Sequence, residues 1–373
     1  MKRTLVLFLV LLLVASSLAG CKSADSGKIR IAVAGPLTGD FAEYGTGFKN
    51  ATEMIAKEYN EAGGVLGREI EIVSYDDKNS GEEAASIAER IAGDKSIVGV
   101  VGHFASGVSM AASPTYQEVG LVEISPSASH PDYSSAGDYI FRNNSLINVE
   151  ARETLEIASE VFDAKRVAIL SVKTDWGTST ANILKNDLAK EFPVFEIVAH
   201  EEIVDGTVDF SPTVTALNAQ NPDTIIVCAM YNILGPFASQ YKDINPDINI
   251  IGFSNAYSEQ LIELAKEDAE GIVLPAIFFH NSTDEKVSNF VSSYEEAYGS
   301  VPSSLTAQAY DSMGMIIEAI KASNSTDREK IKEELYKLRY NGVSGLTEFD
   351  SNGDALKTFN WLVIKDGQFV EYK

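Results

Sequence analysis

The stretch IVGVVGHFAS, residues 97–106, joins an apolar run to a loop that contains glycine, histidine and serine. A helical pattern follows it over residues 107–119. An apolar run without alternation is typical of a parallel strand whose sheet is covered on both faces. The stretch therefore predicts a buried strand, a loop at its carboxyl end and a helix that packs back against the sheet.

Runs of the same kind recur along the chain and alternate with helical patterns. In residues 44–62, for example, apolar side chains recur at the spacing of one helix face. Strands that alternate with helices predict an α/β fold with parallel sheets, and a length of 373 residues predicts two domains. The expected strands span residues 29–34, 69–75, 97–102, 122–124, 166–172, 195–199, 223–230, 248–253 and 271–277.

The order of these patterns changes late in the chain. Two similar series of strands and helices follow one another, over residues 28–144 and 145–275. Three helical stretches and a hairpin pattern come next, with the helices expected at 284–299, 303–322 and 327–338. The change predicts that the end of the chain returns to cover the first series. Ligands of open α/β sheets bind outside the carboxyl ends of the strands, so functional residues are expected there.

The N-terminus has the features of an export signal. Lys2 and Arg3 precede an apolar run over residues 5–14, which is too short to span a membrane. Leu-Ala-Gly-Cys at 18–21 is a lipobox, so residues 1–20 are expected to be a signal peptide and Cys21 to carry a lipid. Residues 21–27 would form a lipidated tether. No other stretch approaches 18 apolar residues, so the mature chain is expected to be extracytoplasmic, membrane-anchored through Cys21 and otherwise soluble.

Composition argues against several classes of function. The net charge is -24, and cleavage would remove Lys2 and Arg3 to leave -26, which opposes binding to nucleic acid. No Gly-x-Ser-x-Gly motif occurs, and no third group is evident beside the serine and histidine pairs, so an enzyme is not expected. Neither Cys21 nor Cys228 has a cysteine partner for a metal site, and the histidines show no ligand spacing. No metal or cofactor is therefore predicted.

Serines at two neighbouring strand ends suggest an anion site. Ser106 is expected to cap the helix over 107–119, whose free backbone N–H groups and dipole favour a negative charge. Ser127 and Ser129, in the stretch ISPSAS at 124–129, add further donors. Two such loops side by side would hold a small carboxylate without arginine. The alternative is that Ser106 is only a helix cap and that Ser127 belongs only to a turn.

The chain also resembles a known family of proteins. It is similar to the leucine/isoleucine/valine-binding proteins, the type I periplasmic solute-binding proteins of ABC importers, over residues 28–373. Each supporting string is weak alone, but their order and spacing are specific. The strings include IAVAGPLTG at 31–39, NEAGGVLGR at 60–68, YDD at 75–77, ISPSAS at 124–129, DWG at 175–177 and FDSNGD at 349–354.

The resemblance implies two Rossmann-like lobes with parallel central sheets, joined by a hinge of three crossovers near Asn144, Pro275 and Thr358. Lobe 1 would comprise residues 28–144 plus 276–357, and lobe 2 residues 145–275 plus 358–373. A cleft between the lobes would close over a ligand and deliver it to ABC permease subunits in the membrane.

The resemblance also implies a set of ligand-binding residues. The first lobe would hold the ligand's carboxylate and part of its ammonium, with an aromatic residue at the cleft mouth, and the second lobe would supply two aromatic side chains and the loop after a strand. The expected ligand is an amino acid, apolar or branched. The expected residues are Tyr44, Phe104, Ala105, Ser106, Ser127, Ala128 and Ser129 from the first lobe, and Trp176, Tyr231, Ser254 and Asn255 from the second.

Two acidic positions leave alternatives open. Ser254 stands where amino-acid binders of the family place an acid that pairs with the ammonium. Either Asp175, Glu259 or Asp311 replaces that acid, or the ligand is an organic acid without an amine, aliphatic or aromatic, or a small amide. A sensory protein that reads the closed form is a further alternative. Glu123 lies inside an apolar strand, either paired beneath the serine loops or at an edge.

Overall fold

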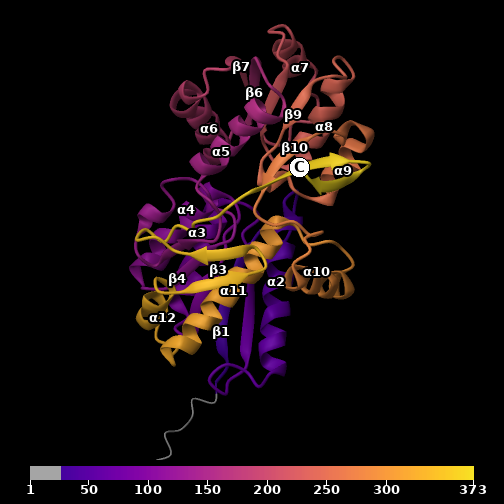
Figure 1. Cartoon of the computed structure of the whole chain (residues 1–373). Coiled ribbons are helices and arrows are strands. Elements are labelled where there is room, and N and C mark those ends of the chain that lie inside the picture. Colours follow the sequence, from indigo (N-terminus) through magenta and orange to yellow (C-terminus); the bar gives the residue numbers. More distant parts are fainter. Residues whose placement is uncertain (1–26) are drawn as a thin grey trace, which may run out of the picture.

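The computed structural model describes residues 27–373. Figure 1 shows two lobes, one above the other, that the chain passes between. The expected signal peptide, Cys21 and the tether up to residue 26 lie outside the described residues. Within residues 27–373, no helix combines the length and the apolar character that a membrane crossing requires.

Lobe 1 is built on a five-stranded sheet in the order β2-β1-β3-β4-β5, and all its pairings are parallel. Its strands are β1 (Ile29–Gly35), β2 (Ile70–Asp76), β3 (Ile97–Val101), β4 (Val122–Ser125) and β5 (Ile140–Arg142). The helices from the first part of the chain are α2 (Ala42–Glu61), α3 (Gly81–Gly93) and α4 (Ser106–Glu118).

The apolar runs arise because helices cover both faces of this sheet. In β1, Ile31 and Val33 pack into the core that contains Phe48 of α2. Ala32 and Ala34 point to the opposite face and pack into the core that contains residues of α3 and α4. Alternate side chains of a strand point to opposite faces, so a strand buried on both faces must be apolar throughout.

Lobe 2 is built on a seven-stranded sheet in the order β14-β13-β10-β9-β8-β6-β7. Its parallel strands are β6 (Arg166–Val172), β7 (Glu196–Ile203), β8 (Thr224–Cys228), β9 (Asn249–Ile251) and β10 (Val273–Ala276). The last strands, β13 (Asn360–Lys365) and β14 (Gln368–Glu371), are antiparallel. Its helices include α5 (Ile147–Glu156), α6 (Asp175–Asn182), α7 (Ser211–Asn218), α8 (Tyr231–Lys242) and α9 (Glu259–Ala265).

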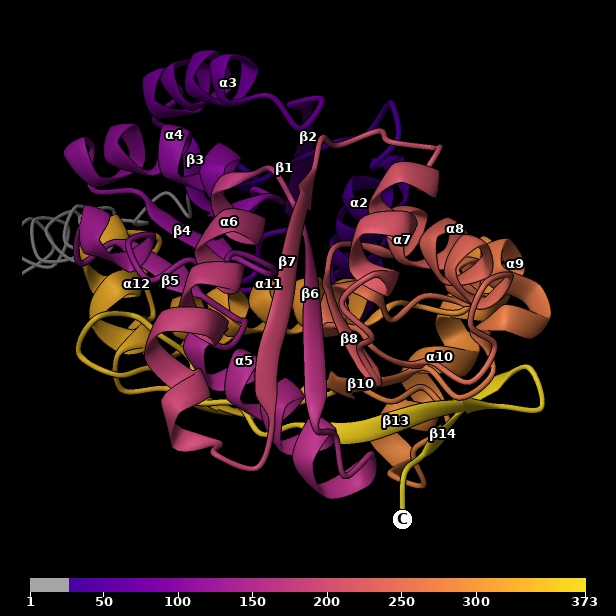
Figure 2. The ribbon, with the colours of Figure 1, turned by 90° about the horizontal axis from the view of Figure 1, so that it is seen from above.

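The chain changes lobe three times. It enters lobe 2 between β5 and β6, and it returns to lobe 1 after β10 to form α10 (Glu285–Tyr298), α11 (Ser304–Ser323) and α12 (Arg328–Leu335). Helices α10 and α11 pack against α2. After the hairpin β11 (Arg339–Gly342) and β12 (Gly345–Glu348), the chain goes back to lobe 2 as β13, beside β10. Figure 2 shows β13 and β14 extending the lobe 2 sheet.

Every strand expected from the sequence is present, and the α/β fold with two sheets whose central strands are parallel is confirmed. Strand β5 was not expected. It has three residues, Ile140, Phe141 and Arg142, and a run this short gives no clear period.

Candidate ligand-binding cleft

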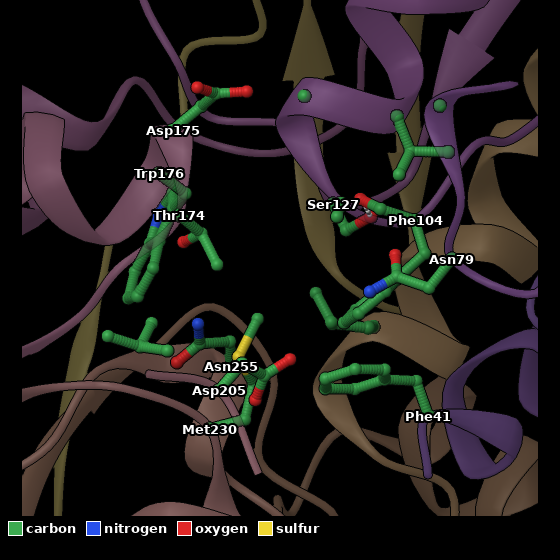
Figure 3. A pocket seen from close by; sticks show the side chains of 16 residues that line it. Phe41, Asn79, Phe104, Ser127, Thr174, Asp175, Trp176, Asp205, Met230 and Asn255 are labelled. Atoms are coloured by element: carbon green, nitrogen blue, oxygen red, sulfur yellow. Dashed lines mark hydrogen bonds between the residues drawn. The ribbon is translucent and has the colours of Figure 1, made fainter. Parts of the chain in front are cut away.

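A cleft of about 440 Å³ lies between the lobes. In Figure 3, Thr174, Asp175 and Trp176 lie on one wall, and Phe41, Asn79 and Phe104 face them. Apart from residues at the ends of β6 and α11, the lining comes from segments that follow strands. The lining residues are Phe41, Asn79, Gly81, Phe104, Ala105, Gly107, Val108, Ser127 and Leu305 of lobe 1, and Val172, Thr174, Asp175, Trp176, Asp205, Met230 and Asn255 of lobe 2.

In lobe 1, the serines of ISPSAS tie two loops together. The Ser125 hydroxyl donates to the His103 carbonyl at 2.9 Å and accepts from the Ala128 N–H at 2.9 Å. The Ser127 hydroxyl donates to the Phe104 carbonyl at 2.6 Å. These bonds fix the loop after β4 against the loop after β3. Ser125 and Ser127 therefore bond to main-chain groups and hold together the two loops that form this wall of the cleft.

The prediction that Ser106 caps the helix is wrong. Helix α4 begins at Ser106, and its N-cap is Ala105, which has an extended conformation and no side-chain cap. The Ser106 hydroxyl instead accepts from the backbone N–H groups of Ser129, at 3.2 Å, and His130, at 3.3 Å. The Ser129 N–H is buried and the His130 N–H is partly buried, and both would otherwise lack a partner, so this contact outweighs a local cap. The first N–H groups of α4 are left without a capping side chain.

A buried polar network supports these loops from below. Glu123 is fully buried in β4, between β3 and β5, so the alternative that it lies at an edge is wrong. Its Oε2 accepts from the Ser113 hydroxyl at 2.7 Å. Burial raises the pKa of Glu123 to about 7. Nearby, His103 Nδ1 lies 2.7 Å from Asp77 Oδ2, and its Nε2 lies 3.1 Å from the Tyr116 hydroxyl.

Arg142 and Gln308 hold the serine loop from behind, and neither was predicted. Arg142 Nη1 donates to the His130 carbonyl at 2.9 Å, and its Nε donates to Asp354 Oδ1 at 2.5 Å. Gln308 Nε2 donates to the Pro126 carbonyl at 2.8 Å. Gln308 lies in α11, far from the loop in sequence, and Arg142 lies in β5, after the loop has ended. No local sequence pattern could therefore indicate either donor.

In lobe 2, the Asp-Trp-Gly string starts helix α6. Its N-cap is Thr174, whose hydroxyl accepts from the Gly177 N–H at 3.1 Å. A Cβ atom at Gly177 would lie 2.1 Å from the Val172 carbonyl oxygen, so only glycine allows the helix to start this close to β6. The tight turn places Asp175 and Trp176 in the cleft wall.

Several hydrogen bonds join the lobes around the cleft. Trp176 Nε1 donates to the Ser129 hydroxyl at 2.9 Å. The Tyr44 hydroxyl donates to the Asn255 carbonyl at 2.8 Å. At a third point, the Ser258 hydroxyl donates to Glu43 Oε1 at 2.8 Å. The lobes are therefore in contact along the cleft, as in a closed arrangement.

The structure brings the predicted residues together, in two layers. Phe104, Ala105, Ser127, Trp176 and Asn255 line the cleft directly. The others are buried beside that lining: Tyr44, Ser106, Ala128, Ser129, Tyr231 and Ser254. Among these, the Tyr44 ring stacks on the Phe104 ring with 4.4 Å between centroids.

Of the three acids considered as replacements at position 254, Asp175 lines the cleft and the other two do not. Asp311 is buried in lobe 1, where it accepts from the backbone N–H groups of Val343 and Ser344. Glu259 lies near His280, with 3.9 Å between Glu259 Oε1 and His280 Nε2. The carboxylates of Asp311 and Glu259 therefore belong to other parts of the fold.

A second cleft acid, Asp205, was missed. It follows β7, which runs to Ile203, whereas the sequence predicted that this strand ends at residue 199. The missed part contains His200, Glu201 and Glu202 on an edge strand. These polar residues interrupt the apolar run from which a strand would be predicted. Burial raises the pKa of Asp205, and the nearby carboxylate of Asp40 raises it further.

Ser254 itself is held by an acid from another element. Its N–H donates to Glu150 Oε1 of α5 at 2.5 Å. Glu150 is buried, and this burial raises its pKa to about 7. The position that lacks an acid in sequence therefore has one beside it in space.

Comparison with known proteins agrees with this architecture. The family model of periplasmic binding proteins matches residues 28–367. The chain belongs to the periplasmic binding protein family. It is similar to the leucine-, isoleucine-, valine-, threonine- and alanine-binding protein of Pseudomonas aeruginosa, with 27% identity over 97% of both chains. These relatives are binding proteins rather than enzymes.

Solved periplasmic binding proteins have the same fold. The branched-chain amino acid transporter substrate-binding protein LivJ of Streptococcus pneumoniae, in complex with isoleucine, is 28% identical. It aligns with a TM-score of 0.85 over 92% of this chain and all of the other. A solute-binding protein of R. palustris, in complex with benzoate, has a TM-score of 0.84 over 92% of this chain and 95% of the other, but 19% identity, so it shows the fold alone. The predicted resemblance to leucine/isoleucine/valine-binding proteins is confirmed.

Proposed function

We propose that this protein is the solute-binding component of an ABC importer, anchored outside the cytoplasm by a lipid on Cys21. Its ligand would be a small amino acid, apolar or branched, bound in the cleft and delivered to permease subunits. The observation that carries the proposal is the cleft itself, which is enclosed by two lobes and lined by apolar side chains beside uncapped N–H groups of α4. The lobe boundaries at residues 144, 275 and 358 are part of the proposal.

In this proposal, each end of the cleft has its own role. The ligand's carboxylate would lie on the loops of residues 104–108 and 127–129, where the start of α4 offers N–H groups and a positive dipole end. The ammonium would pair with Asp205, because the Asp175 carboxylate lies on the carboxylate side, where a Cβ atom at Gly107 would be 2.3 Å from Asp175 Oδ2. The side chain would contact Phe104, Trp176 and their apolar neighbours. Binding to both lobes at once stabilises the closed state.

A second candidate function is the uptake of an organic acid without an amine. It is favoured by Ser254, because the position usually acidic in amino-acid binders of this family has a neutral side chain. The fold can hold such a ligand, as the R. palustris protein in complex with benzoate illustrates.

A thermal-shift screen separates the two candidates. The chain without residues 1–21 would be unfolded and refolded to remove carried-over ligand, then mixed with amino acids, their 2-oxo acids and their methyl esters. Ligands that bind only the folded state raise the melting temperature by mass action. We expect shifts from branched amino acids and none from their esters. Shifts from 2-oxo acids alone would replace the first candidate by the second, and equal shifts from acid and ester would contradict the carboxylate cradle.

The closing contact of Tyr44 gives a separate prediction. Tyr44→Phe keeps the ring on Phe104 but removes the hydroxyl that donates to the Asn255 carbonyl of lobe 2. Loss of about 1.4 kcal/mol from the closed state is expected to weaken ligand binding about tenfold in isothermal titration calorimetry. The control is Tyr298→Phe, which removes a hydroxyl bonded to the Asn50 carbonyl within lobe 1. Equal losses from both variants would contradict a role in closure.

A further inference from the structure

The segment by which the chain leaves lobe 1 for lobe 2 is bonded to the serine loop, residues 124–129. This segment, the first crossover, runs from the end of β5 to the start of α5, over residues 143–147. It donates one hydrogen bond to the carbonyl of each of the three serines. The bonds are from the Asn143 N–H to Ser125 at 2.8 Å, from Asn144 Nδ2 to Ser127 at 2.8 Å and from the Ile147 N–H to Ser129 at 3.0 Å. The pairing of β4 with β5 therefore continues past both strands into the loop that forms the cleft wall.

Of these three bonds, only the one to Ser127 depends on a side chain. Ser127 lines the cleft and lies beside Phe104 in Figure 3. Asn144 is 4% exposed, and its Oδ1 accepts from the Ser145 N–H at 2.9 Å. Because Oδ1 is bonded to the main chain of the crossover, the Nδ2 group is directed at the Ser127 carbonyl. Asn144 thus links a residue of the cleft lining to the connection between the lobes.

Gln308 of α11 holds the serine loop and the first crossover against one another. It is 0% exposed, and its Nε2 donates to the Pro126 carbonyl at 2.8 Å and to the Asn143 carbonyl at 2.7 Å. In return, Asn143 Nδ2 donates to the Gln308 carbonyl at 2.7 Å. Protein interiors are closely packed, so a loop bonded in this way cannot shift without the crossover. A movement of the first crossover therefore reaches the cleft wall.

We propose that Asn144 is a positioning residue for ligand binding, which keeps Ser127 in the cleft wall and couples that wall to the first crossover. This inference rests on the proposed function, because it assumes that a ligand carboxylate lies on the serine loop. Without the Asn144 donor, the partly buried Ser127 carbonyl loses this bond and the loop loses its fixed position. Coupling is reciprocal, so a ligand that orders the loop also fixes the crossover between the lobes.

Asn144→Asp tests the inference in calorimetric titrations of the refolded chain with leucine, isoleucine and valine. The variant keeps the side-chain shape and the oxygen that accepts from Ser145, but an ionised carboxylate cannot donate to the Ser127 carbonyl. At pH 7.5 we expect the tightest of the three ligands to bind the variant at least about tenfold more weakly than wild type. Burial favours the protonated acid, which can donate again, so at pH 5 we expect binding within about threefold of wild type.

Asn60→Asp is the matched control. Asn60 of α2 donates from Nδ2 to the Ile70 carbonyl at 2.9 Å and accepts from the Ile70 N–H at 2.8 Å, outside the cleft lining. We expect this variant to bind within about twofold of wild type at both pH values, because the site is distant. Comparison with wild type at the same pH removes the contribution of the buried acids Glu123 and Glu150, which all the variants share. Asn144→Ala, which adds no charge, is expected to bind about tenfold more weakly at both pH values.

The outcomes are distinguishable. If Asn144→Asp binds as tightly as wild type at pH 7.5, the inference is overturned while the proposed function stands. The same holds if its loss persists at pH 5 or if Asn60→Asp shows an equal loss. The melting temperature of each ligand-free variant shows whether it folds, and if Asn144→Asp does not, wild-type affinity of Asn144→Ala overturns the inference. If none of the three amino acids binds the wild-type chain, the proposed function and the inference fail together.

Discussion

Replacing Arg142 with methionine is expected to lower the free energy of unfolding by about 3–5 kcal/mol, measured by denaturant unfolding of the ligand-free chain. Arg142 is 0% exposed, and its Nε lies 2.5 Å from Asp354 Oδ1. Methionine fills similar space but leaves the buried Asp354 carboxylate without its cation. It also leaves the Ala128 and His130 carbonyls without their donor. Because these carbonyls belong to the serine loop, ligand affinity is expected to fall too.

Two further variants serve as controls for this prediction. Arg152→Met breaks an ion pair with Glu191 whose side chains are 41% and 45% exposed, and exposed pairs contribute about 0–1 kcal/mol. Arg142→Met combined with Asp354→Leu removes both buried charges and is expected to recover part of the loss. An Arg142 variant no less stable than the Arg152 variant would show that the buried pair is unimportant for the lobe.

The sequence predicted the fold well because a strand that is buried on both faces must be apolar throughout, and such a run is visible in the sequence. Ile31 and Val33 contact one core, and Ala32 and Ala34 contact the other, so the strand is apolar without a break. Strand β7 lies at the edge of its sheet and is partly exposed, so its end was misplaced. That error hid Asp205, because the search for ligand-binding residues began at each strand's carboxyl end.

The cleft could be predicted only where it depends on local sequence. Phe104, Ser127 and Trp176 follow strands and were expected in the lining, where the structure has them. Arg142 and Asp354 are 212 residues apart, and no spacing in the sequence relates them. Ser106 illustrates the same limit, since helix-capping preference is local whereas its observed partners, Ser129 and His130, come from the neighbouring loop.

The buried carboxylic acids of Glu123 and Glu150 are expected to make the protein less stable at pH 8 than at pH 5. Burial raises the pKa of each to about 7, above the ordinary value of 4.5. Between these values the folded state keeps protons that the unfolded state has lost, so the free energy of unfolding falls as pH rises. Each group is expected to contribute a fall of roughly 1–3 kcal/mol across this range. Urea unfolding at pH 5, 6, 7 and 8 measures it.

Replacement by glutamine isolates each contribution. Glu123→Gln and Glu150→Gln keep the side-chain shape but cannot ionise, so each variant is expected to flatten the pH profile and to be more stable than wild type at pH 8. The exposed Glu296→Gln is the control and is expected to keep the wild-type slope. The charged or titratable groups around Glu123 are Asp77, His103, Tyr116, Tyr133 and Arg142. If Glu123 were ionised and paired with His103, Glu123→Gln would instead be less stable than wild type at pH 8. The direction of that difference therefore decides whether the support beneath the serine loops is a neutral acid or an ion pair.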